Sequence, residues 1–210
     1  MKIGVIGSGS IGGTVGTLWA RAGHEVLFAS RHPEELEQLL AQAGSKASRG
    51  MPDQAARFGE VVLISVPFKA LAELGRTLSP LLHGKVVLET SNPYPQRDGA
   101  IAEEVLESGR GTGPFVAGWF SNARIVRAFN SVWYETLAKE SHRSPPKIGI
   151  PLASDDRQAL DLAATLVREV GFDPVIVGGL DRAKEFDVGT PVYNTGISGP
   201  DLRRALGLSQ

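Results

Sequence analysis

Short apolar runs alternate along this chain with stretches whose apolar residues recur at helical spacing. Seven runs have strand character: residues 3–6, 25–29, 61–66, 85–89, 124–129, 148–152 and 174–177. Several of them are apolar throughout, which is typical of strands that are buried on both faces of a sheet. The alternation of the two patterns predicts an α/β fold in which helices cross over between mostly parallel strands.

Helical periodicity marks the segments between these runs. Ile11, Val15 and Leu18 repeat on one face of a first helix, and Asp155 or Asp156 is placed to cap a long later one. The helices expected after the first cover residues 33–40, 70–78, 155–170 and 200–206. Loop composition marks residues 90–99 and 141–146, and an ordered loop is expected at 189–196. With right-handed crossovers, this spacing implies the strand order 3-2-1-4-5-6, with later strands added at one edge.

A glycine-rich turn follows the first strand and opens the first helix. Its sequence is Gly7-Ser8-Gly9-Ser10-Ile11-Gly12. In this context the pattern is typical of a dinucleotide-binding Rossmann unit, in which the pyrophosphate lies on the helix N-terminus. Gly7 permits the tight turn, Gly9 lets the backbone approach the pyrophosphate, and Gly12 lets the helix pack against the strand. The alternative is a purely structural turn.

The same glycines have the spacing of a phosphate-binding P-loop, but the chemistry of that loop is missing. Gly13 stands where the lysine that contacts the phosphates is needed. The chain is therefore not expected to be a P-loop nucleotidase.

The end of the second strand indicates which dinucleotide is bound. Enzymes that use NAD place an acid there, about 20 residues beyond the glycines, to bind the ribose 2′-hydroxyl. This chain has Ser30, Arg31 and His32 instead. A hydroxyl and a guanidinium suit a 2′-phosphate, so the sequence predicts NADP(H). The alternative for Arg31 is an ordinary surface arginine.

The run at residues 61–66 ends in Ser65, Val66 and Pro67. Its carboxyl end borders the crevice where open α/β sheets bind ligands, so these residues are expected at the nicotinamide side of the cofactor. For Ser65, a strand that simply ends at a proline is the competing interpretation.

Composition and charge narrow the classes of partner. The chain has 210 residues, a net charge of -1 and an apolar fraction of 42%, so neither nucleic acid nor an anionic membrane is indicated. With no cysteine there is no disulfide, thiolate nucleophile or zinc–thiolate site, and the four histidines lack metal spacing. No signal peptide and no run of the roughly 18 apolar residues of a membrane span is visible, so the cytoplasm is the expected location.

Catalytic machinery of the familiar kinds is not recognisable. The chain is too short for a helical substrate domain, it has no G-x-S-x-G motif, and Tyr134 and Lys139 lack the spacing of the short-chain reductase pair. A flavin or deazaflavin ring can take hydride directly from a nicotinamide. We therefore expect a small-molecule hydride acceptor and no catalytic acid or base from the protein.

These residues together resemble the NADP-dependent oxidoreductases of the deazaflavin coenzyme F420, a group that includes the NADPH-binding domains of metalloreductases. The motifs that carry the resemblance are Gly7–Gly12, Ser30-Arg31, Val66-Pro67, residues 127–130 and residues 189–196. It implies a sheet of eight strands with two small C-terminal additions. A dinucleotide-binding domain is expected at residues 1–150, and a C-terminal part that completes the sheet and the acceptor cleft at 151–210.

The resemblance also implies roles for particular residues. Ser30 and Arg31 would hold the 2′-phosphate, and Ser65, Val66 and Pro67 would flank the nicotinamide ribose. Phe129 and Asn130 would border the nicotinamide, although core packing is the alternative for Phe129. Asn92 and Pro93 are candidates for the acceptor side, and a homodimer is the usual assembly. One departure is that Glu35 or Leu36 stands where some relatives have a lysine.

The leading hypothesis is an enzyme that moves hydride between NADP(H) and a flavin or deazaflavin, which is either a second cofactor or a substrate. One alternative is the reduction of a small imine or carbonyl, as in pyrroline-carboxylate reductases. Another is an NADP-binding or sensing module without catalysis. The roles of four residues stay open: Trp133, Tyr134, Tyr193 and Asn194.

Overall fold

Eight strands form one sheet in the computed structural model, which describes residues 1–208. The strands are β1 (Lys2–Ile6), β2 (Glu25–Ala29), β3 (Ala47–Gly50), β4 (Val61–Ile64), β5 (Val86–Glu89), β6 (Arg124–Arg127), β7 (Gly149–Ala153) and β8 (Asp173–Gly178). Their order is β3-β2-β1-β4-β5-β6-β7-β8. The first six are parallel, β7 runs antiparallel to β6, and β8 is parallel to β7. The predicted Rossmann-type sheet is therefore confirmed.

Ten α-helices and four short 3-10 helices connect the strands within the described residues. The α-helices are α1 (Ser10–Arg21), α2 (Glu37–Ala43), α3 (Pro52–Phe58), α4 (Leu71–Leu78), α5 (Pro95–Asp98), α6 (Ala100–Glu107), α7 (Thr112–Trp119), α8 (Tyr134–Glu140), α9 (Arg157–Glu169) and α10 (Gly199–Ala205). The 3-10 helices are η1 (Pro33–Leu36), η2 (Phe68–Ala70), η3 (Ser79–Leu81) and η4 (Leu180–Glu185). The expected helices are present, and the structure adds several that the periodicity did not show.

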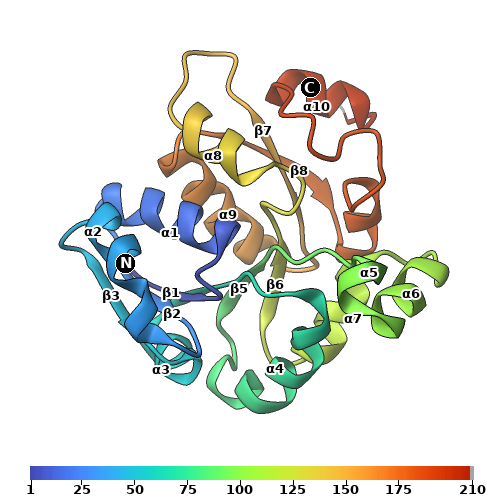
Figure 1. Ribbon diagram of the computed structural model, residues 1–210. Helices are drawn as coiled ribbons and strands as arrows, with labels where there is room; N and C mark the ends of the chain where they lie inside the picture. The colour runs from blue at the N-terminus through green and yellow to red at the C-terminus, as the bar shows by residue number, and fades with distance from the viewer. Residues whose placement is uncertain (209–210) are drawn as a thin grey trace.

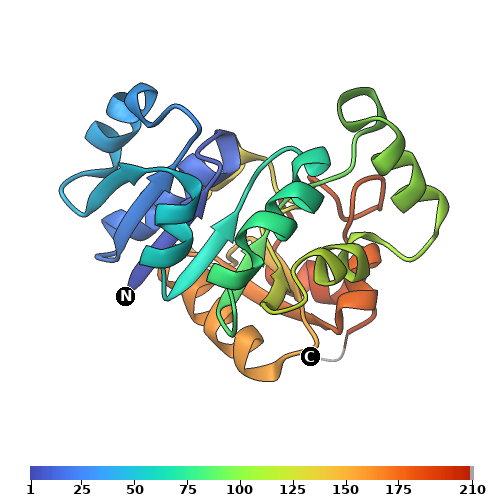
Figure 2. The same ribbon diagram turned by 90° about the horizontal axis from the view of Figure 1, so that it is seen from below.

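The two faces of the sheet carry two separate apolar clusters. Ile3 and Val5 of β1 belong to the cluster beneath α1 and α9, whereas Ile6 belongs to the cluster beneath α3 and α4. Figure 1 shows α1 and α9 on one side of the sheet and α3 and α4 on the other, and Figure 2 gives the view from the α3 and α4 side. This burial of both faces explains why the central strands are apolar throughout.

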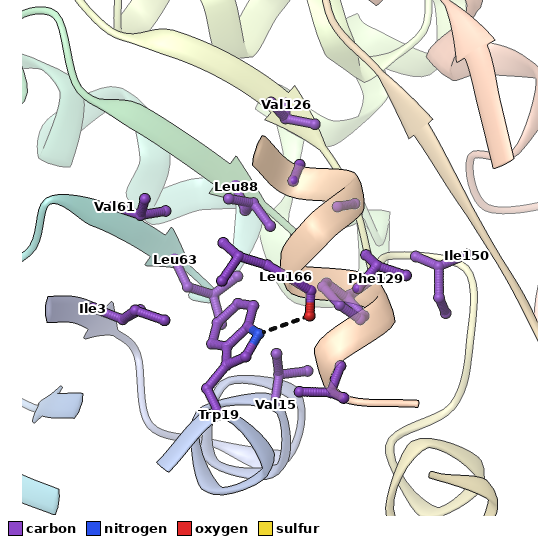
Figure 3. Close-up of a cluster of buried hydrophobic side chains, with 14 of the residues drawn as sticks. Ile3, Val15, Trp19, Val61, Leu63, Leu88, Val126, Phe129, Ile150 and Leu166 are labelled. Carbon is purple, nitrogen blue, oxygen red and sulfur yellow. Dashed lines mark hydrogen bonds between the residues drawn. The ribbon is translucent and has the colours of Figure 1, made fainter. Parts of the chain in front are cut away.

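Trp19 joins α1 to α9 inside the first cluster (Figure 3). Its indole N–H donates to the carbonyl oxygen of Leu166 at 3.1 Å, and the side chain is fully buried. The ring packs edge-on against Phe129, with 5.9 Å between the ring centroids. A buried indole that is both packed and hydrogen-bonded fixes the two helices relative to each other.

Asp156, one of the two expected caps, begins α9. Its carboxylate accepts a hydrogen bond from the backbone N–H of Ala159 at 3.0 Å and pairs with Arg124 of β6 at 2.6 Å. The cap thus attaches the start of α9 to the sheet as well as satisfying its free N–H groups.

The C-terminal part of the chain continues the same sheet. β7 spans the expected division between residues 150 and 151, and its neighbour β8 completes the edge. From there η4 contacts α7, and α10 packs on β7 and β8. Residues 209 and 210 of this part lie outside the described residues. Over residues 1–208, no helix combines the length and the apolar character that crossing a membrane demands.

Candidate dinucleotide and acceptor site

The glycine turn between β1 and α1 leaves the N-terminus of α1 open to a ligand. Gly7 has φ +93°, and a Cβ there would lie 2.2 Å from the carbonyl oxygen of Ser65. A Cβ on Gly12 would lie 2.1 Å from the carbonyl oxygen of Gly7. A Cβ on Gly9, the N-cap of α1, would meet no atom of the described chain within 4 Å. Two glycines are thus fixed by packing, and the third faces open space at the N-terminus of α1.

A first cavity of about 670 Å³ extends from this turn along the end of β2. We call it the nucleotide cavity. Its cations are Arg31 and Lys69, and Lys69 was not foreseen from the sequence. Its acids are Glu35 and Glu73. The two cations provide charge for a phosphate group.

The three residues expected at the 2′-phosphate lie differently. Arg31 and Ser30 both line the nucleotide cavity. The Ser30 hydroxyl accepts a hydrogen bond from the backbone N–H of His32 at 3.1 Å. The His32 ring instead lies 3.4 Å from the Glu34 carboxylate in an exposed pair. The structure thus brings Ser30 and Arg31 together at the cavity, with His32 turned toward a surface acid.

A second cavity of about 530 Å³ lies at the carboxyl ends of β4, β5 and β6. We call it the acceptor cavity. Ser10, Ile11 and Ser65 line it, and Val66 and Pro67 border both this cavity and the nucleotide cavity. The two hollows therefore share a wall at the place where the switch point of the sheet is expected.

Asn92 and Asn130 meet at the floor of the acceptor cavity. The Asn92 side-chain amide donates to the Asn130 carbonyl oxygen at 2.8 Å. Asn130 Oδ1 and Ser91 Oγ are buried and have no hydrogen-bond partner among the described residues. Unpaired buried polar atoms are unusual, and both belong to residues that line this cavity. Both atoms are enclosed by protein, so a ligand in the cavity bonds to them only after these side chains turn.

Two of the expected site residues lie elsewhere. The Phe129 side chain is fully buried against Trp19 in the core, which is its packing alternative. Its backbone has φ 56°, directly before Asn130. Pro93 lines a smaller separate hollow of about 160 Å³ beside α6, together with Leu106 and Val188.

Two tyrosines that are 99 residues apart in the sequence meet at the acceptor cavity. The hydroxyls of Tyr94 and Tyr193 are hydrogen-bonded to each other, and the Asn92 amide donates to the Tyr193 hydroxyl at 3.3 Å. Burial and the hydrogen bond with Tyr94 raise the pKa of the Tyr193 hydroxyl above its ordinary value. Both phenols border the cavity, and the role of Tyr94 was not foreseen because no local motif marks it.

Arg97 and Asp98 hold the loop that carries Tyr94. The Arg97 guanidinium lies over the Tyr94 ring, 4.9 Å from its centroid, and donates to the Asn92 carbonyl oxygen at 2.8 Å. The Asp98 carboxylate accepts from the backbone N–H groups of Tyr94 and Lys69 at 3.0 and 3.3 Å. Although burial opposes it, hydrogen bonds from Arg97 and these two N–H groups keep the pKa of Asp98 below its ordinary value.

A buried ionic cluster contacts Ser91 and Asn92, two of the residues that line the acceptor cavity. Arg127 of β6 is fully buried and hydrogen-bonded to Glu89 of β5, and it pairs with Asp187 at 2.9 Å. Asp187 also accepts from the Thr112 backbone N–H and hydroxyl, each at 2.8 Å. Although burial opposes it, the two carboxylates raise the pKa of Arg127 above its ordinary value. The guanidinium thus connects the sheet to the C-terminal loop.

The remaining aromatic residues differ in exposure. Trp133 borders the acceptor cavity and is 55% exposed. Tyr134 turns its hydroxyl to the Glu135 carboxylate at 3.2 Å, at the surface.

The backbone of Asn194 has φ 57°, and its N–H donates to the Ser131 carbonyl oxygen at 2.8 Å. Within residues 1–208, no group of three or more His, Cys, Asp or Glu side chains is placed to hold a metal ion.

Comparisons with known proteins agree with this geometry. Residues 2–93 match the family described as NADP oxidoreductase, coenzyme F420-dependent. The F420-dependent NADP reductase of Methanothermobacter marburgensis is 28% identical over 205 residues, which cover 91% of this chain and 90% of that protein. The metalloreductase STEAP3 of Rattus norvegicus is 25% identical over 189 residues, 89% of this chain but 36% of that protein.

Solved structures share the fold over nearly the whole chain. A hypothetical protein from Sinorhizobium meliloti superposes with a TM-score of 0.81 and 22% identity, covering 94% of this chain and 95% of that one. A candidate F420-dependent NADP reductase from Arthrobacter sp. FB24 has a TM-score of 0.77 and 23% identity, covering 99% and 96%.

The fold is Rossmann-type, and the matching family and the Methanothermobacter relative are NADP oxidoreductases, which is the class of protein that this chain resembles. Within that class, the resemblance to the coenzyme F420-dependent NADP oxidoreductases is confirmed, and the metalloreductase STEAP3 is a further relative over 36% of its own length.

Proposed function

We propose that the protein transfers hydride between NADP(H) and a flavin-like ring, with the deazaflavin coenzyme F420 as the first candidate. The observation that carries this proposal is the pair of adjoining cavities, one beside the glycine turn and one beyond the shared wall of Val66 and Pro67. A dinucleotide that crosses this wall would present its nicotinamide to the acceptor cavity. The printed name of the Methanothermobacter relative favours F420 as the acceptor.

The cofactor-binding residues follow from this placement. The turn Gly7–Gly12, with Ser8, Gly9, Ser10 and Ile11, would hold the pyrophosphate at the start of α1. Ser30 and Arg31 would hold the 2′-phosphate, with His32 beside them. Lys69 adds a second cation to the same cavity.

At the nicotinamide end, three strand termini supply the contacts. Ser65, Val66 and Pro67 would flank the ribose, and Asn130 would border the nicotinamide. Asn92 would face the acceptor. Phe129 would support Asn130 from the core, and Pro93 would shape the loop after β5. When bound, NADPH supplies the hydride, while these residues bind and orient the two reactants.

The experiment that tests this function is rapid mixing of NADPH-loaded protein with oxidised F420, FMN or a cyclic imine. We expect loss of the reduced-nicotinamide absorbance with F420 or FMN and little with the imine. Reduction of the imine alone would favour the reductase alternative. Binding of NADPH without reduction of any acceptor would favour a non-catalytic binding module.

The cellular setting forms part of the same proposal. We expect a cytoplasmic homodimer that acts on a small molecule, with neither nucleic acid nor a membrane as a partner. Equilibrium sedimentation should give twice the 22.3 kDa of one chain, and a mass of one chain would contradict the dimer.

A further inference from the structure

We propose that the paired hydroxyls of Tyr94 and Tyr193 donate a proton to the hydride acceptor, which makes both of them catalytic residues. This inference rests on the proposed function and departs from the expectation that the protein supplies no acid. It also defines the class of acceptor, which gains a proton as well as a hydride.

The placement of the two hydroxyls supports a shared role. Tyr94 comes from the loop after β5 and Tyr193 from the loop before α10, and both line the acceptor cavity. The Asn92 amide, which is itself fixed by the Asn130 carbonyl oxygen, donates to the Tyr193 oxygen. The segments after β5 and β6 and the loop before α10 thus hold one pair of hydroxyls at the wall of the cavity.

Counting the protons of the pair leaves one donor for a ligand. Each phenol carries one O–H, and only one of the two is used in the hydrogen bond between them. Asn92 donates to the Tyr193 oxygen, so this hydrogen bond uses a lone pair of that oxygen and leaves its O–H free to donate. Whichever tyrosine donates to the other, the pair presents one further O–H that can reach a ligand in the cavity. Burial raises the pKa of the Tyr193 hydroxyl, which keeps that hydroxyl protonated and makes it a weak acid.

The proposed step balances as a two-electron reduction. The nicotinamide loses a hydride, and an electrophilic carbon of the acceptor gains it. The electrons of the acceptor's double bond move to a conjugated nitrogen or oxygen, which takes the proton from the free hydroxyl. Water in the open cavity then returns a proton to the pair. The acceptor is therefore a conjugated ring or a carbonyl-type compound, and not a metal centre that takes single electrons.

The test compares three variants: Tyr94→Phe, Tyr193→Phe and the double variant. In single-turnover experiments with F420, we expect each single change to slow reduction of the ring by about 100-fold. The double change should slow it little further, because the hydroxyls act as a unit. The NADPH dissociation constant should stay within about twofold of the wild-type value. Melting temperatures verify that each variant is folded.

A second readout does not depend on turnover. Oxidised F420 added to protein loaded with NADP⁺ should show a shift of its absorption band, because the free hydroxyl donates a hydrogen bond to the ring. The shift should be absent from the double variant and weakened in each single variant, in which one O–H remains but the hydrogen bond that positions it is lost. Thr165→Val is the control, since that hydroxyl donates to the Asp161 carbonyl oxygen on the exposed face of α9, and it should retain both the rate and the shift.

The outcomes separate this inference from the function on which it rests. A double variant that reduces F420 at the wild-type rate, or that keeps the absorption shift, overturns the hydroxyl pair alone. Failure of the wild-type protein to reduce any ring overturns the proposed function itself.

Discussion

At the scale of single residues, the glycines of the turn separate folding from binding. Gly12→Ala forces a methyl group to within 2.1 Å of the Gly7 carbonyl oxygen, so we expect a loss of about 1–3 kcal/mol in the free energy of unfolding. Gly9→Ala meets open space, so the loss should stay below about 1 kcal/mol. NADPH binding to Gly9→Ala should nevertheless weaken by about tenfold or more, because the methyl group occupies the pyrophosphate position.

Urea unfolding and calorimetric titration of the same two variants measure these effects. Wild-type affinity of Gly9→Ala for NADPH would contradict the placement of the pyrophosphate at this turn. The role of the turn could be predicted from the sequence because all of its residues are consecutive.

Arg31 should determine the preference for NADPH. A charge-assisted contact with the 2′-phosphate contributes about 1.5–3 kcal/mol, so Arg31→Ala should weaken NADPH binding by about 10- to 100-fold. NADH binding should change little, because NADH has no 2′-phosphate. Titration of both cofactors measures the difference, and Arg204→Ala, in an exposed pair with Asp201, is the control. An equal loss for NADPH and NADH would assign Arg31 a structural role.

Other residues of the site could not be predicted, because their partners are distant in the sequence. Tyr94 and Tyr193 are 99 residues apart, and Arg127 and Asp187 are 60 apart. Neither pair has a characteristic spacing, and Arg127 ends a strand of sequence Arg-Ile-Val-Arg in which nothing marks it as part of a site. Only the folded chain brings these groups together.

At the scale of elements, Asp98 ties the loop after β4 to the loop after β5. Because its pKa is lowered in the folded state, its stabilising contribution is full above the unfolded value of about 3.9 and is lost as the pH falls through the lower folded value. Asp98→Asn should therefore reduce the free energy of unfolding by about 1–3 kcal/mol at neutral pH. The difference from the wild-type protein should shrink below about pH 4.

Urea unfolding at several pH values measures this dependence. Asp161→Asn is the matched control, since Asp161 forms an exposed pair with Arg157, and its effect should stay below about 1 kcal/mol. The contradicting result is a free energy of unfolding of Asp98→Asn that differs from that of the wild-type protein by the same amount at every pH. That result would show that the charge of Asp98 does not stabilise the loops.

Elements with strong periodicity were predicted well, and weak ones were missed for identifiable reasons. β3 is a short edge strand of sequence Ala-Ser-Arg-Gly, which lacks the apolar run of a buried strand. α7 contains two glycines and a proline, so its composition indicated no helix. The run at residues 124–129 ended early, because β6 stops at Arg127 and Phe129 adopts a positive φ.

At the scale of the whole molecule, the predicted order 3-2-1-4-5-6 matches the first six strands, although no apolar run marked β3. The reversal of direction that makes β7 antiparallel to β6 was not predictable from periodicity. It directs η4 and the following loop back beside α7, as Figure 1 shows. The acceptor cavity depends on this return, because Tyr193 lies on that loop.

The transfer of deuterium from 4-deuterated NADPH to oxidised F420 tests the central claim most directly. The account predicts that the protein reduces the ring and that one deuterium from the reactive face of NADPH appears on a ring carbon of the product, as mass spectrometry would show. Reduction without deuterium in the ring, or no reduction of the ring while a carbonyl or imine is reduced, would contradict it.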